Sequence, residues 1–173
     1  MLPDNSCANC FNGQITYLQT KLSSVAVFGM SVQPATQGRI LVCRLDYESD
    51  LLESIKALAE KNGFVSATFS AIGAVKNATV SFYDQSEKCY LDLTFDKPLE
   101  VLTCSGNIGK LKGETLVHAH IALSDIEGRA FGGHLMKGTK VFAIEVVMTE
   151  LKHVELLREF DPVTGLNLIR VPQ

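Results

Sequence analysis

The stretch TLVHAHIALSDIEGRAFGGHL, residues 115–135, predicts a strand, a turn and a second strand that runs back beside the first. Apolar side chains alternate with others from Val117 to Leu123, which is the period of a strand with one buried face. Residues 125–129 have the composition of a turn, and Gly128 can take the positive φ that turns often need. The segment therefore predicts a β-hairpin.

Three of the four histidines of the chain lie in this hairpin. His118 and His120 are two residues apart, so they share one strand face, with Cα atoms about 7 Å apart. They could be two half-exposed polar side chains, but the returning strand would bring His134 beside them. Three imidazoles can hold one divalent metal ion per subunit and leave a position open. Zinc is the default, although copper, nickel and iron also accept imidazole. The fourth histidine, His153, is interpreted as a surface residue.

Four further residues are candidates for supporting roles. Gly132 and Gly133 lack a Cβ and would let the backbone of the returning strand approach closely. Glu145 lies in the apolar segment VFAIEVVM, where a buried carboxylate without a partner would be costly. If that segment neighbours the histidine strand, Glu145 could accept a ring N–H of a ligand histidine; otherwise it faces water at a sheet edge. Asp125 is interpreted first as a turn residue, and the alternative is that it carries a proton at the metal site.

The clearest element outside the hairpin is an amphipathic helix over residues 51–62. Asp50 and Glu53 form an aspartate variant of the capping box that starts helices. Apolar side chains recur at helical spacing, and Gly63 stands where a left-handed residue ends a helix. We interpret this helix as a support for the core, without chemistry of its own.

Most of the remaining chain consists of short strand-like segments with turns between them. The segments are residues 39–47, 64–72, 78–83, 90–95, 99–108, 115–123 and 139–149. This pattern favours the α+β class, with a largely antiparallel sheet flanked by one main helix. Near the end of the chain, residues 153–160 predict a short helix and residues 166–171 a last edge strand.

The first 29 residues differ from the rest, because they lack a clean period. We interpret residues 1–37 as an extension or linker outside the fold and residues 38–173 as the domain, with residues 33–38 as a linker. The early segment lacks the pattern of a secretory signal. Cys7 and Cys10 form a lone C-x-x-C, and without a second pair we interpret it as coincidence.

Composition narrows the classes of function. A net charge of −3 over 173 residues is the wrong sign for binding nucleic acid by bulk charge. No apolar run approaches the roughly 20 residues of a membrane helix, so no membrane partner is expected. Five scattered cysteines do not make a disulfide framework and suggest the reducing cytoplasm.

Residues 118–135 resemble the PPC domain, which is named for plants and prokaryotes. The resemblance extends to Arg44-Leu-Asp-Tyr, residues 51–62, Ala71-Ile-Gly-Ala-Val, Gly106-Asn-Ile-Gly, Glu145-Val and residues 158–166. It covers about residues 38–168, which is most of the chain. Gly-Gly-His-Leu after a His-x-His is typical of the prokaryotic, metal-binding branch.

The resemblance implies a compact α+β domain that assembles as a homotrimer. It also implies that His118, His120 and His134 bind a metal ion, generally zinc. Many members carry a DNA-binding label, and plant members join the domain to AT-hooks. This sequence has no Arg-Gly-Arg-Pro-like hook.

Three functions are therefore open at this point. The first is a trimeric, metal-binding PPC domain of undefined biochemical role, with a small-molecule ligand at the metal as an option. The second is a DNA-binding or transcription-regulatory accessory protein. The third is a metal-dependent hydrolase or lyase that uses metal-bound water at the three-histidine site. No second catalytic motif in the sequence supports the third.

Overall fold

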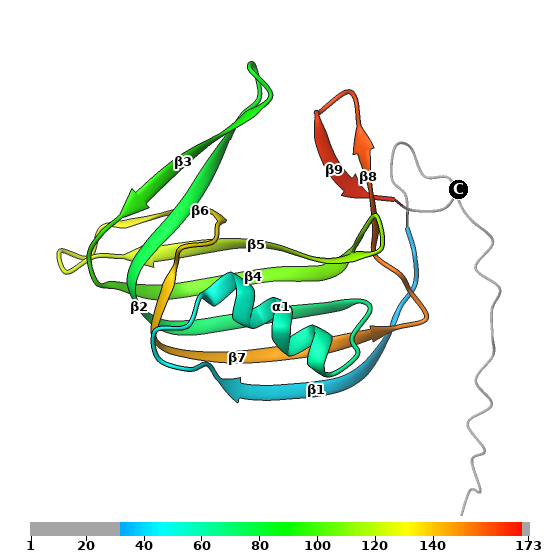
Figure 1. The fold of residues 1–173 in the computed structure, drawn as a ribbon, viewed down its shortest axis with the longest axis horizontal. Coiled ribbons are helices and arrows are strands. Elements are labelled where there is room, and N and C mark those ends of the chain that lie inside the picture. Colours follow the sequence, from blue (N-terminus) through cyan, green and yellow to red (C-terminus); the bar gives the residue numbers. More distant parts are fainter. Residues whose placement is uncertain (1–31, 171–173) are drawn as a thin grey trace, which may run out of the picture. The chain divides into compact units, whose positions relative to one another are not determined.

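A computed structural model describes residues 32–170, which form a strongly curved sheet and one helix (Figure 1). The strands are β1 (Thr36–Arg44), β2 (Ala67–Asp84), β3 (Cys89–Phe95), β4 (Leu99–Leu111), β5 (Glu114–Ser124), β6 (Ala130–Leu135), β7 (Lys140–Lys152), β8 (Leu157–Asp161) and β9 (Leu166–Ile169). The helix is α1 (Leu51–Lys61). The predicted class, a sheet with one main helix, is thus confirmed for the described residues.

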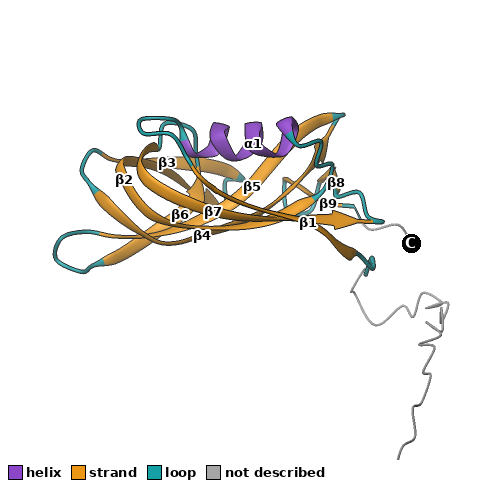
Figure 2. Ribbon diagram, turned by 90° about the horizontal axis from the view of Figure 1, so that it is seen from below, coloured by secondary structure: helices purple, strands orange, loops and turns teal. Residues whose placement is uncertain are grey.

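Helix α1 forms where its capping pattern predicts it. The Asp50 side chain accepts a hydrogen bond from the backbone N–H of Glu53 at 3.1 Å, which satisfies one free donor of the first turn. The chain leaves the helix through Gly63, at a φ of 68°. Leu51, Ile55 and other side chains of one face are buried, and Figure 2 shows α1 over one face of the sheet. The helix therefore closes the core.

Strand β2 organises the sheet because it has different neighbours along its length. Residues 67–75 pair with β4 on one side and β7 on the other. Residues 78–84 pair with β3, and Val80 and Ser81 pair with β6. The path from β2 through β6, β5 and β4 returns to β2, so the sheet curves around its buried side chains.

The prediction of two short strands, residues 64–72 and 78–83, is wrong, because β2 runs from one to the other through Gly73. The pairing with β4 shifts register between Ala71 and Gly73, which is the signature of a β-bulge. Gly73 takes a φ of 135°, which only glycine adopts easily. The glycine thus bends one long strand where the sequence predicts two short ones.

The sheet is mixed, since β8 runs parallel to β4 while the other pairings are antiparallel. The predicted helix over residues 153–160 is wrong, because the second half of this segment is strand β8, which pairs with β4. The backbone N–H of Leu156 donates to Ser66 Oγ at 2.9 Å, and its carbonyl accepts from Lys110 at 2.8 Å. Hydrogen bonds to Ser66 and to the open edge of β4 replace those of a helix. The predicted last strand is confirmed as β9.

The structure corrects the predicted linker and does not describe most of the predicted N-terminal extension. Residues 36–38, assigned to a linker by composition, are the first residues of β1. Residues 1–31, with Cys7 and Cys10, lie outside the described residues. Within residues 32–170, no helix has the length and apolar character to cross a membrane.

Candidate metal centre

The β5–β6 hairpin brings the three histidines together. Residues Ala119, Ile121 and Leu123 bury one face of β5, which leaves His118 and His120 on the other. His134 of β6 lies directly opposite His120 in the antiparallel register. The ring centroids are 5.4, 5.1 and 5.4 Å apart for the pairs 118–120, 118–134 and 120–134. Local alternation and a tight turn therefore produce a cluster of three imidazoles.

The cluster has the donor set of a metal site. One ring nitrogen of each of the three histidines lies within 4.8 Å of those of the other two. Two nitrogens bound to one zinc ion at about 2.0–2.1 Å can be at most about 4.2 Å apart, so small rotations of the rings would complete the site. Among the described residues, no cysteine or carboxylate joins the group. His120 is exposed and the other two are half-buried, which leaves one side open.

The electrostatic surroundings keep two of the imidazoles neutral. Burial, followed by the nearby Arg158 guanidinium, lowers the pKa of His118 to about 4. Burial also lowers the pKa of His134, with smaller effects of His120 and Arg158. A metal ion requires the nitrogen lone pair of a neutral ring, so these shifts favour metal binding at neutral pH.

Arg158 of β8 belongs to the site, and sequence reasoning missed it. Its Nη2 lies 3.0 Å from Nδ1 of His118 and donates to Oδ1 of Asn107 at 2.7 Å. Its Nη1 donates to the carbonyl of Asn167 at 3.0 Å. Asn107 faces His118 across the β4–β5 pair. The only signal in the sequence is that Arg158 begins the tail segment that resembles the family.

The β3 side of the cluster is lined by polar and aromatic groups. The ring of Tyr90 lies 5.4 Å from that of His134, centroid to centroid. Ser81 is opposite His134 in the β2–β6 pair, and its hydroxyl donates a hydrogen bond to Oδ1 of Asp92. An aromatic ring thus lies next to the imidazole of His134.

The structure places Glu145 away from the histidines. Strand β7 lies between β1 and β2, so the condition for a contact between Glu145 and a ligand histidine is not met. Glu145 is exposed and faces Arg44 and Ile72 in the register of the sheet. The alternative interpretation is right that Glu145 faces water, but it is wrong about the sheet edge, because β7 is an interior strand.

Asp125 organises the hairpin turn. Its Oδ1 accepts from the backbone N–H groups of Glu127 and Arg129, both at 3.1 Å. Its Oδ2 accepts from the side chains of Lys97 and Arg129 at 3.1 and 2.6 Å. These partners, above all Arg129, hold the pKa of the Asp125 carboxyl far below its usual range. A carboxylate so engaged is a poor proton carrier.

Gly132 and Gly133 lie where the backbones approach closely. A Cβ at Gly132 would collide with the carbonyl oxygen of Ile121 on β5. A Cβ at Gly133 would lie 2.8 Å from the carbonyl oxygen of Ser81 on β2. Both glycines thus permit the strand pairings that place His134.

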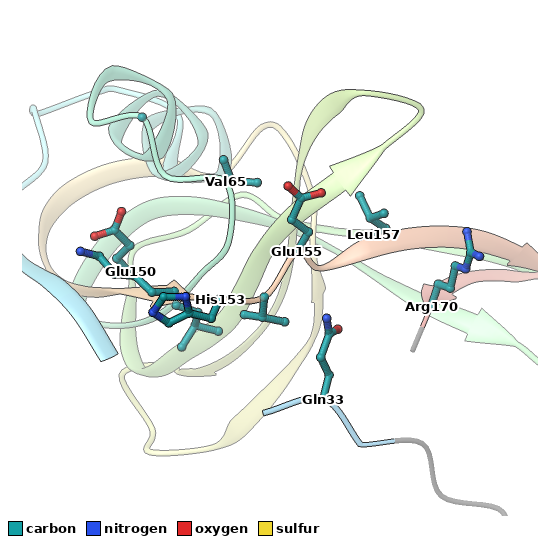
Figure 3. Close-up of a pocket in the computed structure, with 11 residues that line it drawn as sticks. Gln33, Val65, Glu150, His153, Glu155, Leu157 and Arg170 are labelled. Carbon is teal, nitrogen blue, oxygen red and sulfur yellow. The ribbon is translucent and has the colours of Figure 1, made fainter. Parts of the chain in front are cut away.

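A surface hollow of about 770 Å³ lies elsewhere in the fold (Figure 3). Its lining includes Glu150, His153, Glu155 and Arg170, and none of the three clustered histidines. His153 is exposed, as predicted. The carboxylate of Glu150 is paired with Arg39 at 2.8 Å. Because its charges do not converge on one point, the hollow has less support as a chemical site than the histidine cluster.

The fold and the cluster define a small β-rich domain with a candidate three-histidine metal centre. The chain belongs to the Plants and Prokaryotes Conserved domain family, abbreviated PPC or PCC, whose pattern matches residues 32–152. The sequence resemblance to this family is thereby confirmed.

Solved structures share this fold along nearly their whole length. A metal-containing protein of Archaeoglobus fulgidus is 38% identical, with a TM-score of 0.78, and the match covers 82% of this chain and 99% of that one. A plant- and prokaryote-conserved protein of Pyrococcus horikoshii is 31% identical, with a TM-score of 0.76, and the match covers 85% of this chain and 99% of that one.

A curated relative is much longer than this chain. The bifunctional protein GlmU of Synechococcus sp. (strain JA-3-3Ab) is 32% identical over 140 residues. The match covers 77% of this chain and 21% of the relative. The chain therefore spans about a fifth of the curated relatives that it matches.

Proposed function

We propose that this domain binds one divalent metal ion per chain, with zinc first, on His118, His120 and His134, and that the ion presents an open position to a small molecule. The observation that carries the proposal is the group of three imidazole nitrogens within 4.8 Å of one another, from two paired strands. The lowered pKa values of His118 and His134 support it. So does the likeness to the metal-containing protein of Archaeoglobus fulgidus.

Binding has more support than catalysis. A metal ion with an open position can polarise a ligand or activate a bound water molecule. A hydrolase or lyase would also need a group that moves a proton. Glu145 lies on another part of the sheet, and Asp125 is engaged by Lys97 and Arg129. Neither carboxylate that the sequence singled out is therefore placed to move a proton at the cluster, and we infer a ligand-binding role first.

The direct test is a metal titration of the full chain after removal of metal with a chelator. We expect about one zinc ion per chain at pH 8. Because the pKa of His118 is about 4 and that of His134 is lowered, protonation of these two ligands should compete with the metal at a lower pH than for an ordinary histidine. Elemental analysis that finds almost no metal at pH 8 would contradict the proposal.

We further propose that the domain assembles as a homotrimer, as the family resemblance implies. Exposed apolar side chains cluster on the outer face of β1, β7 and β2: Ile40, Val42, Ile72, Phe142 and Val147. Val42 and Val147 are cross-strand partners, so the patch is continuous. Exposed apolar surface of this kind is typical of contacts between proteins, and other copies of the chain are its proposed occupants.

Replacing both Val42 and Val147 by aspartate is expected to convert the trimer into a monomer. Each copy would then have to bury carboxylates without partners in the contact. The measurement is molar mass by light scattering after size-exclusion chromatography. Val163→Asp is the matched control, because Val163 is exposed in the turn between β8 and β9. A wild-type chain that elutes as a monomer would refute the trimer.

A DNA-binding role has weaker support. A protein of Ralstonia eutropha with the same fold, 27% identical and with a TM-score of 0.68, carries a provisional DNA-binding label. This chain has a net charge of −3, and the one helix of the described part buries its apolar face against the sheet. No structural feature of residues 32–170 therefore favours this role over metal-dependent binding.

A further inference from the structure

Arg158 is a buried cation without a counter-ion among the described residues. Its side chain is inside the fold, with the residue only 7% exposed. All its hydrogen-bond partners are neutral: Oδ1 of Asn107, the carbonyl of Asn167 and Nδ1 of His118. No carboxylate of residues 32–170 forms an ion pair with it. Proteins normally pair a buried charge, because leaving it alone is costly.

The guanidinium also has an unused donor. Nε of Arg158 is buried and has no hydrogen-bond partner within the described part of the chain. Buried N–H groups are almost always satisfied, and an exception in a native fold calls for an explanation. Nε and Nη2 form a planar fork, and an N–H of this fork donates a strong, charge-assisted hydrogen bond to a carboxylate oxygen.

This donor stands beside the proposed metal site. The guanidinium can only donate, so the 3.0 Å contact makes Nδ1 of His118 an acceptor and puts the proton of the neutral ring on Nε2. The hydrogen bond from Arg158 therefore engages the lone pair on Nδ1 that His118 would give to a metal ion. If His118 gives that lone pair to a metal ion, Nη2 of Arg158 keeps Asn107 but loses one of its two acceptors, so a second N–H of the guanidinium needs a partner.

Metal binding would also make the charge balance worse. A divalent ion on neutral imidazoles next to Arg158 would bring three positive charges together. No carboxylate of the described chain joins the histidine group to offset them. An anion from outside would relieve both the charge and the unsatisfied Nε.

We propose that the site binds the carboxylate of a small organic acid between Arg158 and the open metal position. The proposal rests on the proposed metal site and adds the class of ligand. One carboxylate oxygen accepts from the Arg158 fork, and the other occupies the open position. The aromatic ring of Tyr90, next to His134, lies on the side where the rest of the acid would extend. Arg158 is thus a specificity residue, and anion binding depends on metal.

The test uses cobalt(II) as a spectroscopic probe of the metal site. The full chain is loaded with cobalt, and its visible spectrum is titrated with acetate, with neutral acetamide and with inorganic phosphate. We expect acetate to change the spectrum with a dissociation constant about ten- to a hundredfold lower in the wild type than in Arg158→Gln, since one charged hydrogen-bonding group is lost. Acetamide should bind no better to the wild type than to the variant.

Two further variants keep the test decisive. Arg158→Lys retains the charge but loses the fork, so an intermediate affinity is expected, and it replaces Arg158→Gln if the latter does not fold. Arg170→Gln is the matched control, because Arg170 is an arginine paired with Glu159 at 2.9 Å on the surface. It should bind acetate like the wild type.

The outcomes separate the two proposals. If every variant takes up about one cobalt ion and acetate binds equally to the wild type and Arg158→Gln, the carboxylate site is overturned while the metal site stands. If phosphate binds more tightly than acetate, the ligand class is overturned. If the wild type takes up no cobalt, both proposals fail.

Discussion

Replacement of His118 and His120 together by alanine is expected to remove metal binding almost completely. The content should fall from about one ion per chain to below roughly a tenth, because one imidazole alone does not hold zinc at a protein site. The fold should survive, since both side chains lie on the face of β5 opposite the buried Ala119 and Ile121. The measurement is elemental analysis after dialysis, with circular dichroism as the check on folding.

The matched control is His153→Ala, which removes an exposed histidine outside the cluster. It should keep the full metal content. A double variant that holds as much metal as the wild type would show that the metal binds elsewhere. Equal, near-zero content in the wild type and in the double variant would refute the metal site altogether.

The second large effect is expected from Gly132→Ala. The new methyl group would run into the carbonyl oxygen of Ile121, a backbone atom that cannot rotate away. Overpacking inside a fold typically costs about 1–3 kcal/mol, and here it also disturbs the β5–β6 pairing that sets His134 opposite His120. We therefore expect a stability loss at the upper end of that range and weaker metal binding. Chemical denaturation and zinc titration measure the two effects.

Gly128→Asn is the control for this prediction. Gly128 lies in the same hairpin, has a φ of 74°, and has open space around the position of a Cβ. Asparagine tolerates the left-handed region better than other residues. Stability and metal affinity close to those of the wild type are expected. If Gly132→Ala is as stable as Gly128→Asn, the close approach of β5 and β6 is not a constraint on the site.

Some parts of the fold were accessible from local sequence patterns. The capping residues Asp50 and Glu53 and the helical spacing predicted α1 to within one residue of its observed end. The hairpin was accessible for the same reason, because turn chemistry and period-two alternation act over a few neighbouring residues. These two patterns also predicted that His134 would lie beside His118 and His120.

Other parts depended on contacts between distant segments. The helical pattern of residues 153–160 was overridden because the edge of β4 offered hydrogen bonds to this segment. The prediction for Glu145 depended on which strand neighbours β7, and the order of strands in a sheet is not encoded in the period of one strand. Gly73 was predicted to end a strand, but the pairing partners on both sides of β2 keep the chain extended.

The amino-acid sequence by itself determined the helix, the hairpin, the three candidate ligands and the family. These depend on spacings of a few residues, in which backbone geometry dictates where each side chain points. Only the tertiary structure decided what surrounds the ligands. It brought Arg158, forty residues after His118, into hydrogen-bond contact with it, and it left Glu145 on the outer face. Such contacts depend on the order and curvature of the strands. These are set only when the whole sheet packs around one core.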